Sequence, residues 1–296
     1  MKTLKNLSLV LTLIISLTLL SEQLNALFYP TLQSRIEQGQ LANILLIGSD
    51  ARPGEMQTRG DTIMLLSINP ALNKAALISI PRDTRITYRG QDTKINMVNQ
   101  VKGPETLCQE VGKLLNTRVD HYVVTDFAGF EEIIDLFGGV YVNVEVSVHN
   151  RDVYLEKGYQ HLNGKEALAY ARHRANPDMD IGRVQRQQRL LLALYQQMMQ
   201  VENLTLLPQL VPQLKEHVHT NISFKDLLYL ARQAAKFKDG EVIPQTLPGY
   251  HYFAPYSGAS YWEVDRKISR GLLKGLFDGQ QYDIYLPAPP GTYYGN

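Results

Sequence analysis

The sequence contains a single cysteine, Cys108, among its 296 residues, so no disulfide can form within the chain. The stretch ETLCQEVGKLL predicts an amphipathic helix in which Cys108 lies beside Leu107 and Val111, as a small core residue. The chain also has almost no excess of charge of either sign, because its 30 Lys and Arg nearly equal its 29 Asp and Glu in number. A net charge of +1 gives no broad basic surface, which argues against a nucleic-acid partner.

Sequence motifs of several enzyme classes are absent as well. The chain has no Gly-x-x-x-x-Gly-Lys loop, which excludes a P-loop nucleotide site. It has neither Gly-x-Ser-x-Gly nor His-Glu-x-x-His, the signatures of two hydrolase classes. Its hydrophobic fraction of 44% and charged fraction of 20% are those of an ordinary globular protein with a substantial core.

The N-terminal residues have the character of an export signal. Lys2 and Lys5 precede an apolar stretch over residues 7–20, and polar residues follow it. A full transmembrane helix needs about 20 apolar residues, so the run fits a cleaved signal as well as a retained single-pass anchor with the domain outside. We assign residues 1–26 to this signal or anchor and residues 27–40 to a short linker.

Predicted strands and helices alternate between residues 41 and 277. Apolar runs predict strands at 43–47, 62–68 and 75–80. HYVVTDFAGFEEIIDLFGGVYVNV follows the order strand, helix, Gly-Gly stop and strand. Later helices are expected after the caps Asn163 and Ser223 and over IGRVQRQQRLLLALYQQMMQ. This alternation predicts a layered α/β fold with a mixed sheet in one domain, followed by a Pro/Gly/Tyr-rich tail at 278–296.

Charged residues follow the ends of the predicted strands. Asp50 comes just after the first strand, and Arg59 and Asp61 come just before the second. Loops at the strand ends of open α/β sheets are where ligands bind. Two carboxylates there suit a hard divalent cation such as Mg²⁺, which combines one or two of them with substrate phosphates. The alternative is a solvated polar loop.

Weaker candidates occur after the third strand. In ISIPRDT, Arg82 offers a planar, permanently charged fork that suits a phosphate, and a surface pair with Asp83 is the alternative. In TKINMVNQ, Lys94 and Asn96 lie at the start of a predicted helix, where anions are favoured.

The densest charge lies in YARHRANPDMDIGRVQRQQRLL, residues 170–191. In an extended segment, residues two apart face the same side, so we expect Arg172 and Arg174 to point at one ligand. His173 then lies on the opposite side, where we interpret it as a packing residue and not as a catalytic base. Asp178 and Asp180 follow, and Asp180 either caps the next helix or keeps an arginine of that helix oriented.

On that next helix, Arg183 and Gln187 are four residues apart and share a face. Arg186 and Arg189 lie on a different side, where we expect them to be solvated or structural. Several arginines with two carboxylates favour a site for pyrophosphate and Mg²⁺ over a site for a single phosphate, because phosphoryl chemistry needs charge neutralisation and positioning.

These pieces, in this order, resemble the LytR-CpsA-Psr family of bacterial cell-envelope enzymes over about residues 43–189. The resemblance is carried by NILLIGSDAR, RGDTIMLLSINP, ISIPRDT, KIN, FGGVYVNV, GYQHLNGKEALAYARHR and DIGRVQRQQ. It implies a three-layer α/β/α sandwich around a central mixed sheet, with residues 41–277 as the catalytic domain. It also implies transfer of a glycopolymer from a polyprenyl (undecaprenyl) pyrophosphate carrier to peptidoglycan, outside the cell membrane and assisted by Mg²⁺ or Mn²⁺.

The resemblance assigns roles to single positions. Asp50, Asp61 and Arg59 match the catalytic positions, and the two aspartates match the metal ligands. The pyrophosphate-binding positions are Arg59, Arg82, Arg172, Arg174, Arg183 and Gln187. Whether Asp50 binds the metal or accepts the proton of the attacking hydroxyl stays open.

Two further alternatives also stay open. The apolar helices that begin near residues 128 and 190 are either the wall of a tunnel for the lipid tail or ordinary core. The same residues with water as acceptor would make a polyprenyl pyrophosphate hydrolase, and a non-catalytic envelope regulator is the third hypothesis.

Overall fold

The computed structural model describes residues 31–50, 59–174, 179–200, 205–237, 240–255 and 257–289. The expected signal or anchor at 1–26 and the end of the tail at 290–296 lie outside the described residues. Within the described ranges, no helix has the length and apolar character that crossing a membrane requires.

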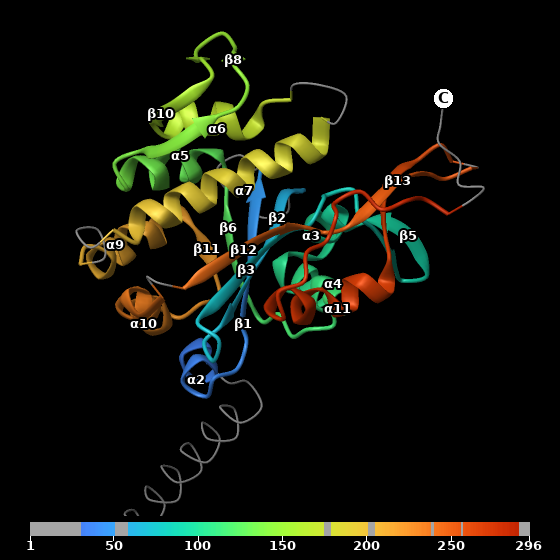
Figure 1. Ribbon diagram of the computed structural model, residues 1–296, viewed down its shortest axis with the longest axis horizontal. Coiled ribbons are helices and arrows are strands. Elements are labelled where there is room, and N and C mark those ends of the chain that lie inside the picture. Colours follow the sequence, from blue (N-terminus) through green and yellow to red (C-terminus); the bar gives the residue numbers. More distant parts are fainter. Residues whose placement is uncertain are drawn as a thin grey trace, which may run out of the picture.

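A six-stranded mixed sheet forms the centre of the fold (Figure 1). Its strand order is β11 (His219–Thr220), β6 (His121–Thr125), β1 (Ala42–Ser49), β2 (Gly60–Asn69), β3 (Lys74–Ser79) and β12 (Glu241–Thr246). The pairs β1–β6 and β3–β12 are parallel, and the other neighbours are antiparallel. The strands predicted at 43–47, 62–68 and 75–80 are therefore confirmed, together with the mixed sheet.

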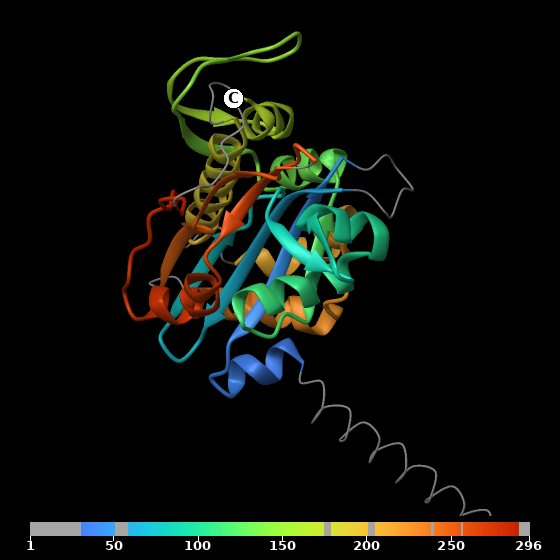
Figure 2. The same ribbon diagram turned by 90° about the vertical axis from the view of Figure 1, so that its right-hand side faces the viewer.

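Helices cover both faces of this sheet, which gives the expected three layers (Figures 1 and 2). In β1, Leu45 and Ile47 point to one face and Ile44 points to the other, as alternation along a strand requires. The first face packs against α3 (Ile95–Lys102), α4 (Pro104–Leu115) and α11 (Arg266–Phe277). The second face packs against α2 (Leu32–Glu37), α10 (Phe224–Gln233) and the long helix α7 (Met179–Met198).

Helices α5 (Phe127–Leu136) and α6 (Gly164–Arg172) form a smaller lobe with the strand pair β7 (Val140–Val144) and β10 (Gly158–Leu162), seen at the top of Figure 1. The short pair β8 (Val148–His149) and β9 (Tyr154–Leu155) extends from it. Gly138 and Gly139 end α5 at φ +74° and +82°, in the left-handed region that favours glycine. Asn163 and Glu166 form the predicted capping box of α6.

The remaining elements lie around these layers. They are the hairpins β4 (Arg85–Tyr88)–β5 (Gln91–Lys94) and β13 (Gly249–Phe253)–β14 (Ser260–Val264), helix α9 (Leu207–Leu214), and the short 3₁₀ helices η1 (Lys215–His217) and η2 (Ala234–Phe237). The segment expected as a linker at 27–40 contains α2, whose Leu32 and Ile36 are buried in the core. Apolar residues at helical spacing draw this segment onto the sheet. Cys108 is buried as predicted, and burial raises the pKa of its thiol to about 12.

Candidate functional site

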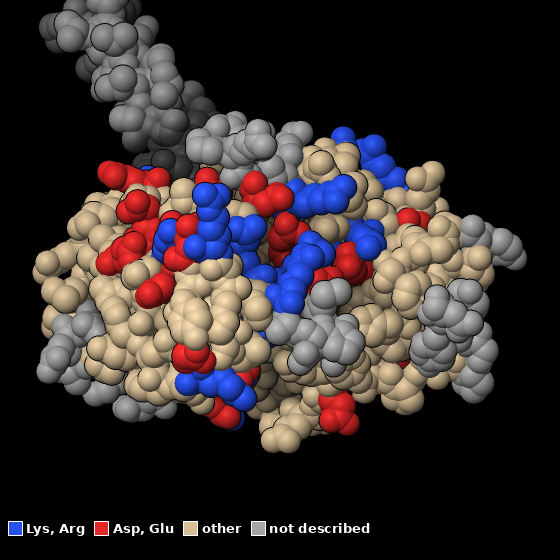
Figure 3. Space-filling view, turned by 90° about the horizontal axis from the view of Figure 1, so that it is seen from above, with Lys and Arg blue, Asp and Glu red and all other residues tan. Residues whose placement is uncertain are grey.

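Eight predicted site residues surround one cavity of about 820 Å³. They are Asp50, Arg59, Asp61, Arg82, Arg172, Arg174, Arg183 and Gln187. The cavity lies between the second face of the sheet and helices α5, α6 and α7, because side chains from all of these elements line it. Figure 3 shows blue and red side chains gathered together on the face above the sheet. The structure thus brings together residues that are 137 positions apart in the sequence, from Asp50 to Gln187.

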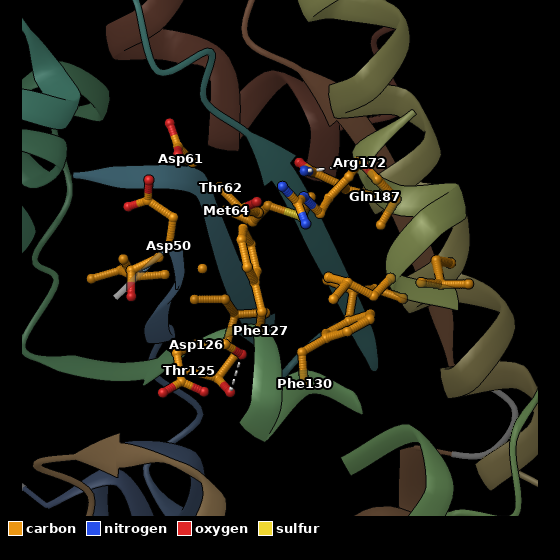
Figure 4. A pocket seen from close by; sticks show the side chains of 18 of the residues that line it. Asp50, Asp61, Thr62, Met64, Thr125, Asp126, Phe127, Phe130, Arg172 and Gln187 are labelled. Atoms are coloured by element: carbon orange, nitrogen blue, oxygen red, sulfur yellow. Dashed lines mark hydrogen bonds between the residues drawn. The ribbon is translucent and has the colours of Figure 1, made fainter. Parts of the chain in front are cut away.

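The two aspartates come together because β1 and β2 are antiparallel neighbours. Ser49, at the end of β1, pairs with Gly60, at the start of β2, so Asp50 and Asp61 lie at the same edge of the sheet. Figure 4 shows both carboxylates on one side of the cavity, with Arg172 and Gln187 on the other. The arrangement places two negative groups opposite positive and amide groups across an open space.

Arg82 pairs with two carboxylates at the mouth of the cavity. Its Nη1 donates to Asp61 Oδ1 at 2.7 Å, and its Nη2 lies 3.4 Å from Asp180 Oδ2. Asp180 Oδ1 also accepts from Arg183 Nη2 at 3.1 Å, so Asp180 connects the two arginines. Burial alone would lower the pKa of Arg82, but the neighbouring carboxylates, Asp61 first among them, raise it. The hypothesis that Asp180 keeps Arg183 oriented is therefore supported by a direct contact.

Arg183 carries a positive charge that the described residues do not fully compensate. It is only 5% exposed, and burial together with Arg82 and Arg174 lowers its pKa in spite of Asp180. Among the described residues, no hydrogen-bond partner meets Nε of Arg82, Nε of Arg183 or Oε1 of Gln187, although all three atoms are buried. Arg35 and Arg186, which do not line the cavity, also have Nε atoms without a partner among the described residues, so these nitrogens do not by themselves mark a ligand site. What suits an anion is the gathering of several guanidinium groups around one cavity.

Arg172 lies where the charged mouth of the cavity meets its apolar interior. Its guanidinium stacks over the ring of Phe127, with Cζ 4.3 Å from the ring centroid. The prediction of an extended segment at this point was wrong for Arg172, which is the last residue of α6. The capped helix continues through Arg172, and only His173 turns the backbone to an extended conformation. Arg174 follows it, is exposed and still lines the cavity.

Apolar side chains line the remainder of the cavity. They come from the strands, from α5, from α6, from the second half of α7 and from the residue between η1 and β11: Leu46, Ile47, Met64, Val123, Phe127, Phe130, Ile133, Ile134, Leu168, Ala171, Leu190, Leu191, Leu194 and Val218. The two helices proposed as tunnel walls therefore do line a cavity. Phe127 and Phe130, which the sequence analysis did not single out, project into it (Figure 4). An aromatic pair at spacing i, i+3 after the N-cap Asp126 is the signal that was available.

The three weaker candidates do not line this cavity. Lys94 Nζ pairs with Asp83 Oδ1 at 3.0 Å, so both charges compensate each other. Asn96 is buried in α3 with 5% exposure. Asp83 lines a separate small cavity of about 80 Å³ behind Arg82. The alternative of a surface pair between Arg82 and Asp83 does not hold, because Arg82 pairs with Asp61 and Asp180.

Of the two alternatives expected for Arg186, solvated or structural, the structural one is confirmed. Arg186 is 4% exposed and pairs with Glu145, which also accepts from Arg189. The helical pattern placed both arginines away from Arg183 correctly, but it could not show that Glu145 meets them from the end of β7. His173 is half-buried, and burial together with Arg186 lowers the pKa of its imidazole, which keeps it neutral at pH 7.

The acidic residues at the mouth limit how a metal could bind. Within the ranges that the structure describes, no three His, Cys, Asp or Glu side chains are grouped to hold a metal ion. Asp50 and Asp61 lie at neighbouring strand ends and line the cavity, and Asp61 is shared with Arg82. Asp126 also lines the cavity, where its side chain accepts from the main-chain nitrogen of Gly129. Such a pair fits Mg²⁺, which commonly takes one or two carboxylates and completes its shell with water and substrate phosphates.

Comparisons with known proteins show the family of this chain. The model of the LytR_cpsA_psr family matches residues 21–276. The chain belongs to that family. Similar relatives include the polyisoprenyl-teichoic acid–peptidoglycan teichoic acid transferase TagV of Bacillus subtilis strain 168, which is 30% identical over 258 residues, covering 83% of this chain and 65% of TagV. The regulatory protein MsrR of Staphylococcus aureus is 38% identical over 243 residues, covering 80% of this chain and 74% of MsrR.

Solved structures of family members share the fold. The crystal structure of B. subtilis TagV superimposes with a TM-score of 0.70 at 30% identity, covering 84% of this chain and 99% of that one. A structure of TagT bound to LI-WTA gives a TM-score of 0.65 at 27% identity, covering 80% of this chain and 90% of that one. The chain spans slightly less than two thirds of the full length of TagV.

Proposed function

We propose that this protein is an extracytoplasmic transferase that moves a glycopolymer from a polyprenyl pyrophosphate carrier to peptidoglycan. One observation carries the proposal: a single cavity has a cluster of arginines and aspartates at its mouth and a long apolar interior behind it. A polyprenyl pyrophosphate has the same two parts, a doubly charged head and a hydrocarbon tail. The names of the relatives TagV and TagU, both teichoic acid transferases, support the substrate class.

The transfer we propose forms one bond and breaks another at phosphorus. A peptidoglycan hydroxyl attacks the phosphorus that carries the glycopolymer, the phosphoanhydride bond breaks, and the polyprenyl phosphate leaves. The hydroxyl proton passes to a carboxylate at the mouth. Asp50 suits this step because it is exposed at the edge of the sheet, whereas Asp61 is engaged by Arg82. Arg82, Arg183 and Gln187 hold the pyrophosphate oxygens and take up the charge that develops on them.

A bound Mg²⁺, or Mn²⁺ in its place, would neutralise charge on the pyrophosphate oxygens. Asp61 would hold it, with phosphate oxygens as further ligands. Asp50 would either join them or accept the proton, because the two roles compete for one carboxylate. The protein should then bind the metal only together with the pyrophosphate. We expect 1 mM Mg²⁺ alone to leave the unfolding temperature unchanged and to raise it in the presence of geranyl pyrophosphate. A large shift with Mg²⁺ alone would contradict this assignment.

The decisive experiment is a transfer assay with purified protein, a polyprenyl-pyrophosphate-linked saccharide, Mg²⁺ and peptidoglycan. We expect saccharide to become covalently attached to peptidoglycan, and we expect Arg183→Ala to abolish attachment in a protein that remains folded. Phosphate release at the same rate with and without peptidoglycan would identify a hydrolase instead. Absence of both activities with tight binding of the lipid would favour a regulator.

The proposed substrates imply a position at the outer surface of the membrane. We propose that the N-terminal 26 residues direct export and hold the chain there, or direct its secretion if they are cleaved. Fusion of alkaline phosphatase to the C-terminus tests this, because the reporter is active only outside the cytoplasm. The proposed location would be contradicted if the alkaline phosphatase fusion were inactive and a fusion to a reporter that works only in the cytoplasm were active.

A further inference from the structure

A second polar cluster lies beside the mouth of the cavity without lining it. Glu145, directly after β7, accepts hydrogen bonds from Tyr170 Oη at 2.5 Å, from Arg189 Nη1 at 2.6 Å and from Arg186 Nη1 at 3.3 Å. Arg186 uses its second terminal nitrogen to donate to the main-chain carbonyl of His173 at 2.5 Å. One carboxylate thus joins the end of α6, the middle of α7 and the end of β7.

The His173 carbonyl belongs to the segment that carries two of the arginines lining the cavity. His173 caps the C-terminal end of α6 and lies between Arg172 and Arg174, which both line the cavity. Its backbone changes there from helical to extended. A donor fixed on the neighbouring helix therefore sets the direction in which the chain leaves α6.

We propose that Arg186 is a positioning residue, which holds the main chain at His173 so that Arg172 and Arg174 reach the pyrophosphate together. The ligand in this inference rests on the proposed function, whereas the link from Arg186 to His173 does not. Arginine suits the task because its planar fork donates to two partners at once in a fixed geometry.

The groups that hold Arg186 keep their protonation states around neutral pH. Burial by itself would raise the pKa of Glu145, but the hydrogen bond from Tyr170 and the charge of Arg189 lower it. Burial and the bond to Glu145 raise the pKa of Tyr170 to about 12. The carboxylate therefore stays charged and the phenol stays a donor, and Tyr170 itself is fully buried.

Arg35 provides a matched control at the opposite end of the sheet. It is also nearly buried, with 9% exposure, and it also joins a carboxylate to a carbonyl, through Asp120 at 2.9 Å and Leu41 O at 3.4 Å. Arg35 does not line the cavity. Loss of Arg35 should therefore reproduce the general cost of removing a buried arginine without affecting the mouth.

The test combines amide hydrogen exchange with binding of geranyl pyrophosphate in the presence of Mg²⁺, using the full chain. We expect Arg186→Ala to accelerate exchange in peptides that cover residues 170–174 and to weaken binding about 10- to 100-fold. Arg35→Ala should change neither. Glu145→Gln is a second variant in case Arg186→Ala does not fold. It keeps Arg186 but removes the charge that holds its guanidinium, so exchange should again be faster and binding weaker.

A double-mutant cycle separates positioning from general destabilisation. In a background that already carries Arg174→Ala, the Arg186 substitution should cost less affinity than it does alone, whereas the Arg35 substitution should be additive. Wild-type binding and exchange in both Arg186→Ala and Glu145→Gln would overturn the inference and leave the proposed function intact. If the wild type binds no polyprenyl pyrophosphate, the proposed function fails, and the exchange data alone decide whether Arg186 orders residues 170–174.

Discussion

Arg82 donates to Asp61 at 2.7 Å and thereby connects the end of β3 to the start of β2 at the mouth of the cavity. The same guanidinium reaches Asp180 on α7, so one side chain links two strands to the helix that forms the cavity wall. The two carboxylates hold the guanidinium in one orientation. Arg82 also lines the cavity, so an anion bound there would lie next to an arginine that is already oriented.

Arg82→Ala should weaken the binding of geranyl pyrophosphate about 10- to 100-fold, because hydrogen bonds to charged groups contribute about 1.5–3 kcal/mol. Arg82→Lys should recover little, since a lysine lacks the planar fork. Isothermal titration calorimetry measures the change. Arg85→Ala is the matched control, because Arg85 pairs with Asp92 and Glu263 outside the cavity at similar exposure. Equal losses for both variants would refute a specific role of Arg82.

Arg183→Met should separate stability from binding. The pKa of Arg183 is lowered by burial, so the fold without ligand disfavours its charge, and Asp180 keeps Arg82 as a partner after the substitution. We expect the free energy of unfolding without ligand to stay the same or to rise by about 1 kcal/mol. The thermal shift produced by a polyprenyl pyrophosphate should disappear. A strong destabilisation without ligand would show that Arg183 is needed for the fold itself.

Leu194→Trp should shorten the lipid that the cavity accepts. Leu194 lines the apolar interior about 16 Å along α7 from Arg183, given a rise of about 1.5 Å per residue. Geranyl pyrophosphate should bind as it does to the wild type, while longer polyprenyl pyrophosphates should lose affinity. Leu72→Trp, at an exposed position outside the cavity, is the control. Unchanged affinity for long chains would place the tail elsewhere.

Asp180→Asn should change the pH dependence of stability. Burial alone would raise the pKa of Asp180, but Arg183, Arg82 and Arg174 lower it below its usual value. The carboxylate therefore stabilises the fold above its unfolded pKa of about 3.9, and this contribution is lost as the pH falls through the lower folded value. Urea unfolding should show a less stable variant at pH 7 and a difference that shrinks below pH ~4. A difference independent of pH would contradict the assignment.

Sequence reasoning succeeded where a property is local. The capping box at Asn163 and Glu166, the Gly138–Gly139 stop and the buried strand from Asn43 depend on neighbours in the chain, and all three are present. The same holds for the shared helix face of Arg183 and Gln187, which follows from a spacing of four residues. Interactions of short sequence separation can be derived from the periodicity of helices and strands.

Properties that depend on distant partners could not be derived in this way. No spacing relates Arg82 to Asp180, 98 positions away, or Arg186 to Glu145, 41 positions away. Of the two alternatives for Arg186, solvated or structural, the structural one holds because a carboxylate that follows β7 pairs with it on that face of α7. The extended segment expected at Arg172 is the last turn of a capped helix.

The sequence by itself determined the class of fold, the order of its elements and the set of charged residues at their ends, because these depend on hydrophobic periodicity and local capping. Only the tertiary structure decided that eight of those residues share one cavity and that the cavity continues into an apolar interior. The physical reason is that strand pairing and helix packing are long-range. Asp50 meets Asp61 through the antiparallel pairing of β1 with β2, and Arg172 meets Phe127 through the packing of α6 against α5.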